Sequence, residues 1–220
     1  MGEAEIKDRT IIIHSVLFFY GSQANDALST QIASDIAHHW NEPRATVQLH
    51  HTTYRVVFDI EGIWSKCLTP EMLFENTHPR NNYFRIEKFA HGNISFVDAL
   101  NCNTGYFLLD NLLNNSTTAA HEYGHTLGLD HPPVLDIRGK GVPGIMYPRG
   151  TWTDPEFQYS PVALPGEAGG TMNPFTRKVT QQDIEALKIH RLNFDETRFP
   201  VIGGFSSIWH EAHSNNEPLV

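Results

Sequence analysis

A stretch of eleven residues, with the pattern H-E-x-x-H-x-x-G-x-x-H, constrains the fold of this chain more than any other feature. Residues four apart lie on one face of an α-helix, so His121 and His125 can each direct a ring nitrogen at one metal ion. Glu122 is rotated by roughly 100° from His121 about the helix axis. This rotation places its carboxylate beside the metal ion, where a general base would stand.

His131 cannot reach the same ion from a continuing helix, because six further residues advance roughly 9 Å along the axis and turn to another face. The helix must therefore end, and Gly128 stands where a left-handed turn carries no side-chain penalty. Three histidines leave a fourth tetrahedral position free, as in catalytic rather than structural zinc sites. An ordinary helix with exposed histidines is the alternative, but the glycine and third histidine at fixed offsets make it the weaker one.

The eleven residues resemble the zinc-binding consensus of the metzincin metalloendopeptidases, and the second half reads most like the matrixins, the matrix-metalloproteinase family. The resemblance implies one catalytic Zn²⁺ bound by His121, His125 and His131. It also implies Glu122 as the catalytic base and an extended polypeptide as the substrate. The family also allows Ca²⁺, although no acidic loop of this sequence matches a recognisable calcium site.

Metzincins carry a methionine in a tight turn beneath the metal, and Gly144-Ile145-Met146-Tyr147-Pro148 resembles the matrixin version of that turn. The thioether of Met146 would provide an apolar floor under the imidazoles without binding the metal. Met172 in Gly170-Thr171-Met172-Asn173-Pro174 is the competing candidate. We favour Met146 because it is nearer to His131 and its flanking residues match better.

The sequence departs from the matrixin pattern at several positions. Pro132 stands where matrixins usually have serine, and Gly150 stands where they have a tyrosine that walls the S1′ pocket. The sequence has no match to their cysteine-switch propeptide or to the loop of their second, structural zinc. The subfamily and the residue preferred after the cleaved bond therefore stay open.

The order of predicted elements indicates an α+β fold. A strand over residues 10–20 is followed by a helix to about residue 40 and by strands at 47–49, 54–60 and 105–110. This order predicts a twisted sheet backed by helices. The resemblance makes the expectation metzincin-like: a mostly parallel sheet, a backing helix and the zinc helix in an upper lobe, above a loop-rich lower lobe.

Residues 83–89 and 94–99 are predicted to form a hairpin that turns at 91–93. In metzincins an edge strand of the sheet pairs with the extended substrate above the zinc, a form of β-augmentation. The best candidate for that edge is Ile94 to Ala99, and the stretch 83–89 is its rival.

Residues 132–176 are rich in proline and glycine and predict the loop-dominated lower lobe, which ends in a helix from Val179 to Arg191. We treat residues 1–220 as one catalytic domain. Its expected parts are an upper lobe of about 1–130, a lower lobe of about 131–205 and a polar tail of about 206–220. His210 and His213 lie three residues apart, and we assign them to the tail rather than to a metal site.

Composition excludes some classes of partner. A net charge of −9 argues against nucleic acid, because binding to phosphates needs a basic face. No apolar run approaches the ~20 residues that span a membrane. We also expect the protein to be a monomer.

Cys67 and Cys102 permit one disulfide at most, and both the paired and the free state stay open. We expect a secreted or extracellular protein, although the N-terminus lacks the features of a signal peptide, and this leaves the cytoplasm as the alternative.

These observations favour a zinc-dependent endopeptidase in which Glu122 activates a zinc-bound water. Two alternatives remain: a zinc-bearing module that binds a peptide or partner without cutting it, and a zinc hydrolase of a non-protein amide. The presence of Glu122 argues against the first, and the predicted edge strand for an extended peptide argues against the second.

Overall fold

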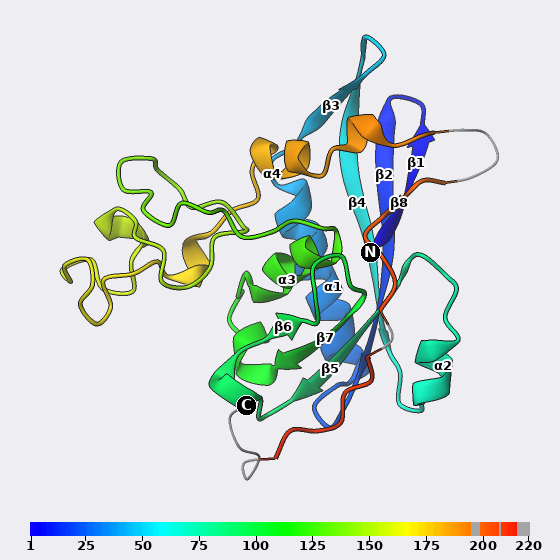
Figure 1. Cartoon of the computed structure of the whole chain (residues 1–220), viewed down its shortest axis with the longest axis horizontal. Coiled ribbons are helices and arrows are strands. Elements are labelled where there is room, and N and C mark those ends of the chain that lie inside the picture. Colours follow the sequence, from blue (N-terminus) through cyan, green and yellow to red (C-terminus); the bar gives the residue numbers. More distant parts are fainter. Residues whose placement is uncertain (195–198, 207, 215–220) are drawn as a thin grey trace.

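A curled sheet of eight strands, parallel at its centre, forms the middle of the computed structural model, which describes residues 1–194, 199–206 and 208–214 (Figure 1). The strands are β1 (Gly2–Lys7), β2 (Thr10–Tyr20), β3 (Thr46–Leu49), β4 (Thr52–Trp64), β5 (Asn81–Glu87), β6 (Phe96–Val97), β7 (Thr104–Leu108) and β8 (Val201–Ile202). The central strands β4, β2, β5 and β7 pair in parallel. Antiparallel pairings add β3 beside β4, β6 beside β7, and β1 between β2 and β8.

In the described part of the chain, four α-helices accompany the sheet: α1 (Asp26–Asn41), α2 (Pro70–Phe74), α3 (Thr118–Thr126) and α4 (Gln181–Ala186). Short 3₁₀ turns occur at His91–Asn93, Leu109–Leu112, Pro155–Phe157, Pro174–Thr176 and Ile189–Arg191. The expected α+β class is therefore confirmed. Within the described residues, no helix has the length and apolarity needed to cross a membrane.

Strand β2 has one face in the core. Its buried side chains alternate with more exposed ones, the pattern of a strand that buries only one face. The fully buried members are Ile11, Ile13, Leu17 and Phe19. Ser15 is the polar member of this row, and its hydroxyl lies 2.8 Å from the hydroxyl of Tyr123 on α3. The strand therefore positions α3 as well as the core.

Helix α1 covers one face of the sheet and lies beside α3 (Figure 1). It begins at Asp26, and the side chain of its N-cap residue Asn25 accepts a hydrogen bond from the Leu28 N–H at 3.0 Å. Its buried stripe includes Ile32, Ile36 and Trp40. The indole Nε1 of Trp40 donates to the carbonyl of Ala120 at 3.0 Å, so α1 fixes the position of α3.

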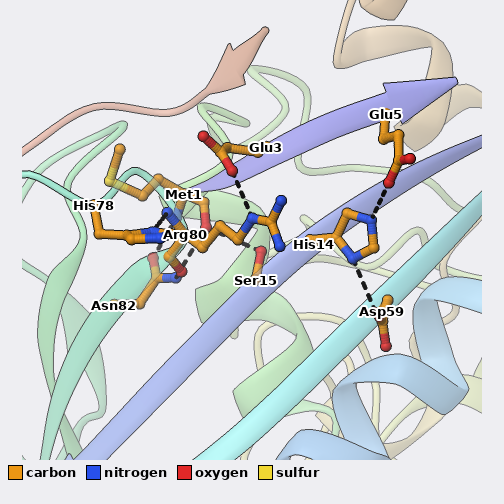
Figure 2. A network of polar contacts seen from close by, with 9 residues as sticks. All are labelled: Met1, Glu3, Glu5, His14, Ser15, Asp59, His78, Arg80 and Asn82. Atoms are coloured by element: carbon orange, nitrogen blue, oxygen red, sulfur yellow. Dashed lines mark hydrogen bonds and ion pairs between the residues drawn. The ribbon is translucent and has the colours of Figure 1, made fainter. Parts of the chain in front are cut away.

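Polar side chains connect β1, β2 and β4, and Figure 2 shows this network. His14 on β2 lies between two carboxylates, with Nδ1 2.9 Å from Asp59 and Nε2 3.2 Å from Glu5. Nearby, Arg80 donates from Nε to Glu3 at 2.5 Å. Pairs of this partly exposed kind contribute about 0–1 kcal/mol each, so the pairing of β1 rests mainly on its backbone. The sequence did not reveal β1, which lies before the first predicted strand.

The predicted hairpin of residues 83–89 with 94–99 is wrong. Strand β5 pairs in parallel with β2 and β7, whereas β6 pairs antiparallel with β7. Tyr83, Phe84 and Ile86 are all buried, a near-continuous apolar run typical of a central parallel strand rather than of a hairpin. Both edges of β5 are therefore occupied, and the 94–99 segment takes the next strand in the chain as its partner.

The C-terminal helix is shorter than predicted. Thr180 and Asp183 form a capping box at the start of α4, but the helix ends after Ala186 instead of continuing to Arg191. Lys188 adopts a left-handed conformation with φ 54°, which breaks the α-helical path before the last 3₁₀ turn.

The described part of the predicted tail packs on the sheet. The Trp209 ring stacks on Tyr20 with centroids 4.8 Å apart, and Nε2 of His210 lies 2.7 Å from Oδ1 of Asp98. The His213 ring stacks on Tyr106 at 4.2 Å. Residues 207 and 215–220 of the predicted tail lie outside the described residues. Both cysteines, Cys67 and Cys102, are free.

Candidate metal centre

Helix α3 carries two of the three predicted ligands and is anchored at its N-terminus. Ser116 Oγ accepts a hydrogen bond from the Thr118 N–H at 3.1 Å, whereas the side chain of the N-cap residue Thr117 makes no capping bond. The Thr117 hydroxyl donates instead to the carbonyl of Pro174 at 2.6 Å, which ties the helix to the loop-rich part of the chain. These contacts, with those to Trp40 and Ser15, hold the helix on both sides.

The helix ends at the predicted glycine. Gly128 has φ +94°, and its N–H donates to the carbonyl of His125 at 3.0 Å. A side chain at this position would also meet Asn101, whose Oδ1 lies 2.2 Å from where a Cβ would be. The left-handed turn reverses the chain and returns His131 toward the helix, as the spacing of the motif requires.

The structure brings His121, His125 and His131 together at their Nε2 atoms. The Nε2 of His131 lies 3.1 Å from that of His121 and 3.1 Å from that of His125, and the other two are 3.2 Å apart. A tetrahedral zinc with bonds of ~2.0–2.1 Å separates its nitrogen ligands by about 3.3–3.4 Å. Among the described residues these three form the one group of three or more His, Cys, Asp or Glu close enough to hold a metal ion.

The hydrogen bonds of the opposite ring nitrogens fit a metal site. Nδ1 of His121 lies 2.7 Å from the carbonyl oxygen of Ile145, and Nδ1 of His125 lies 2.7 Å from that of Leu129. Carbonyl oxygens only accept, so both Nδ1 atoms carry the proton and both Nε2 lone pairs face the third histidine. Burial lowers the pKa of all three histidines and favours their neutral forms. Converging lone pairs repel one another unless a cation lies between them, so the donor set fits a divalent metal.

Glu122 is buried next to this cluster. Its carboxylate accepts a hydrogen bond from the backbone N–H of Val97 on β6. Burial raises the pKa of Glu122 to about 8, while the charge of Arg177 and the Val97 N–H act in the opposite direction. The predicted base therefore bridges α3 and the edge strand.

Met146 lies against the same helix. Its side chain is 3% exposed, and its sulfur lies 2.4 Å from where a Cβ would be at Gly124, between the two helical histidines in sequence. The preceding residue, Ile145, accepts from His121 and donates its own N–H to the carboxylate of Asp183. The competing Met172 is also fully buried, but its N–H donates to the carbonyl of Thr151 in the loop-rich part.

A cavity of about 380 Å³ opens beside the three histidines. Residues 94–97, which include β6, form one wall, and β6 lies at an edge of the sheet. The rival stretch 83–89 lies mostly in β5, inside the sheet. The remaining lining residues include His121, Glu122, His125, His131, Arg149 and Arg177. The size is within the ~300–1,000 Å³ typical of ligand pockets.

Sequence reasoning missed the two arginines of this cavity. Arg177 is only 4% exposed and reaches the site from a loop far along the chain. An isolated arginine in a loop belongs to no motif, so no sequence signal could have placed it. Gly150, the position expected to affect the pocket wall, has no atom within 4 Å of where a Cβ would be, and its neighbour Arg149 lines the cavity instead.

Comparisons with known proteins add little. No family model matches the sequence, and no curated protein matches it either. Among solved structures, the chain aligns with myroilysin at 13% sequence identity, over 82% of this chain and 94% of that chain, with a TM-score of 0.36. An alignment this approximate carries no argument about activity, so any functional conclusion rests on the residues of the site.

Proposed function

We propose that this chain is a zinc-dependent endopeptidase of the metzincin type, with matrixins as the most similar branch. The observation that carries the proposal is the convergence of three imidazole Nε2 atoms, 3.1–3.2 Å apart, beside a buried glutamate. His121, His125 and His131 would hold the metal. When bound, zinc lowers the pKa of water and polarises a carbonyl group.

Glu122 is the proposed general base. It would accept a proton from the attacking water and deliver it to the nitrogen of the departing amine. The Val97 N–H holds its carboxylate in place, and the shared cavity puts it next to the histidines. A carboxyl group whose pKa burial has moved toward neutrality is suited to both directions of proton transfer.

Strand β6 supports a peptide substrate over other amides. The strand lies at a sheet edge and lines the cavity, so an extended chain can pair with the backbone between residues 94 and 97. The Val97 N–H is already bonded to Glu122, so the substrate would pair with the remaining backbone groups of this segment. Pairing of this kind positions a scissile carbonyl near Glu122 without requiring any particular side chain.

The test combines metal content with cleavage. Protein loaded with zinc is analysed by elemental mass spectrometry, and a mixed peptide library is digested in parallel by wild type and Glu122→Gln. We expect one zinc per chain in both proteins, internal cuts by wild type, and a loss of at least about 10²-fold in the variant. Equal cleavage by both proteins would show that Glu122 is not the base. Zinc binding without cleavage by wild type would favour the module that binds a peptide or partner without cutting it. Hydrolysis of a non-protein amide without cleavage of any peptide would favour the zinc hydrolase of non-protein amides.

A further inference from the structure

We propose that Arg149 and Arg177 make this site select substrates that present a carboxylate next to the cleaved bond. Acidic peptides, with aspartate or glutamate beside the scissile bond, are the substrate class this predicts. The inference rests on the proposed function for its location, since both arginines line the cavity that contains Glu122 and the three histidines. It concerns residues outside the zinc motif.

Arg177 is a buried cation that donates hydrogen bonds to neutral acceptors. Its Nε donates to Thr117 Oγ1 at 3.0 Å, and its Nη1 donates to the carbonyl of Tyr147 at 3.1 Å. These two bonds fix the plane of the guanidinium group, because a planar fork held at two nitrogens cannot rotate freely. Neither acceptor carries a charge, and burial lowers the pKa of Arg177 to about 10, while the charge of Glu122 acts in the opposite direction. A buried guanidinium is costly, and Glu122 is the one carboxylate that the cavity offers to both arginines.

Arg149 lies at the protein surface, whereas Arg177 is buried. Its side chain is exposed, and its Nη2 donates to the amide oxygen of Asn111 at 3.1 Å. Asn111 also lines the cavity, so this bond holds the cation at the cavity wall rather than free in solvent. The acceptor is again neutral. The two arginines also act on each other, because Arg149 is among the charges that disfavour the charged form of Arg177.

The charge balance of the cavity favours an anion. Glu122 is the one acidic side chain among the lining residues, against two arginines and three neutral histidines. A divalent metal on the histidines would make the local charge more positive still. This contrasts with the chain as a whole, which carries a net charge of −9, so the basic character is confined to the site. An anionic group of the substrate relieves the repulsion between the two arginines.

A carboxylate is the anion that fits best. Guanidinium groups bind carboxylates through paired N–H donors, and such charge-assisted bonds are stronger and more directional than neutral ones. Two sources share this chemistry: an acidic side chain within the peptide, and the carboxylate at the C-terminus of a short peptide. The cavity opens along the edge strand, where an extended chain could continue past the site, and we therefore expect the side chain to be the main source.

The experiment compares matched peptides. After the library has located the cuts, peptides blocked at both ends carry glutamate or glutamine at each position flanking the bond. We expect wild type to prefer glutamate by at least about tenfold in kcat/KM.

Arg149→Gln should reduce this preference several-fold, and Arg149→Lys should restore part of it. Arg177→Lys should also reduce it, with circular dichroism and zinc content checking that the variant folds. Arg9→Gln, an exposed arginine on the β1–β2 turn, is the matched control and should leave the preference unchanged.

A third peptide, with neutral side chains and a free C-terminus after the bond, separates the two carboxylate sources. A preference for this peptide alone would assign the arginines to the terminal carboxylate instead of the side chain. Equal cleavage of glutamate and glutamine peptides, or a preference that survives in Arg149→Gln and Arg177→Lys, would overturn the inference while leaving the peptidase proposal intact.

Binding is measured separately by calorimetry with zinc-loaded Glu122→Gln, using otherwise neutral peptides that are blocked at both ends and carry a single glutamate or glutamine. Tighter binding of the glutamate peptide, lost when Arg149→Gln is added, would support the inference even if wild type cleaves nothing. Equal binding of both peptides would contradict it. The failure of the inference and the failure of the proposed function therefore give different results.

Discussion

The carbonyl oxygen of Ile145 lies 2.7 Å from Nδ1 of His121, although the two residues belong to different parts of the chain. The same peptide segment donates the Ile145 N–H to the carboxylate of Asp183 at the start of α4. Met146 follows directly and packs on α3. One short turn therefore orients an imidazole of the candidate metal centre, supports the helix that carries it, and is itself held by a helix cap.

Replacing Asp183 tests this connection. Asp183→Ala removes both the capping box with Thr180 and the bond to the Ile145 N–H. We expect a loss of about 1–2 kcal/mol in the free energy of unfolding, measured by urea denaturation, together with weaker zinc binding. Glu185→Ala, an exposed neighbour on the same helix, should change stability by less than about 0.5 kcal/mol. Equal effects of the two variants would show that the connection is not important.

Removing one histidine tests the metal centre. His131→Ala leaves two of the three converging nitrogens, so we expect zinc affinity to fall by more than the ~10–100-fold that follows the loss of a hydrogen bond to a metal ligand. Competition with a chromophoric chelator measures the affinity. The control is His51→Ala, an exposed histidine in the turn between β3 and β4. Unchanged zinc affinity in His131→Ala would exclude this residue as a ligand.

Gly128→Ala tests the turn that returns His131 to the helix. The residue has φ +94°, and the added methyl group would lie 2.2 Å from Oδ1 of Asn101. A left-handed alanine costs about 1–2 kcal/mol before any collision is counted. Gly139→Ala is the matched control. Gly139 also has a positive φ, of +75°, but no atom lies within 4 Å of where its added methyl group would be. We expect a larger fall in melting temperature and in zinc affinity for Gly128→Ala, and equal falls would argue against the contact with Asn101.

His39 should make the stability of the fold depend on pH, independently of the metal centre. Burial lowers its pKa below 6.5, with the charge of His38 acting in the same direction. A histidine kept neutral in the fold is protonated more readily when unfolded, so the folded state loses stability as the pH falls below 6.5. His39→Gln should lose less stability than wild type between about pH 7.5 and pH 5.5, with metal removed from both proteins. His51→Gln should behave like wild type, and an unchanged slope in His39→Gln would contradict the prediction.

Local spacing was enough to bring the three histidines together. His121 and His125 share a helix face because they are four residues apart, and Gly128 reverses the chain within the same eleven residues. The strand over residues 10–20 and the helix to about residue 40 were likewise predicted from local patterns, and both elements formed there. Such features depend on dihedral angles and on side chains a few residues apart, which the sequence states directly.

Only the tertiary structure decided the rest of the site. The sequence suggested that residues 94–99 pair with 83–89, but β6 pairs with β7, because β5 is occupied on both edges by parallel neighbours. The contact of Ile145 with His121 and the arrival of Arg177 in the cavity likewise join residues far apart in the chain. No local periodicity encodes such pairings. They depend on which surfaces remain free once the sheet has formed, and that is determined only by the packing of the whole chain.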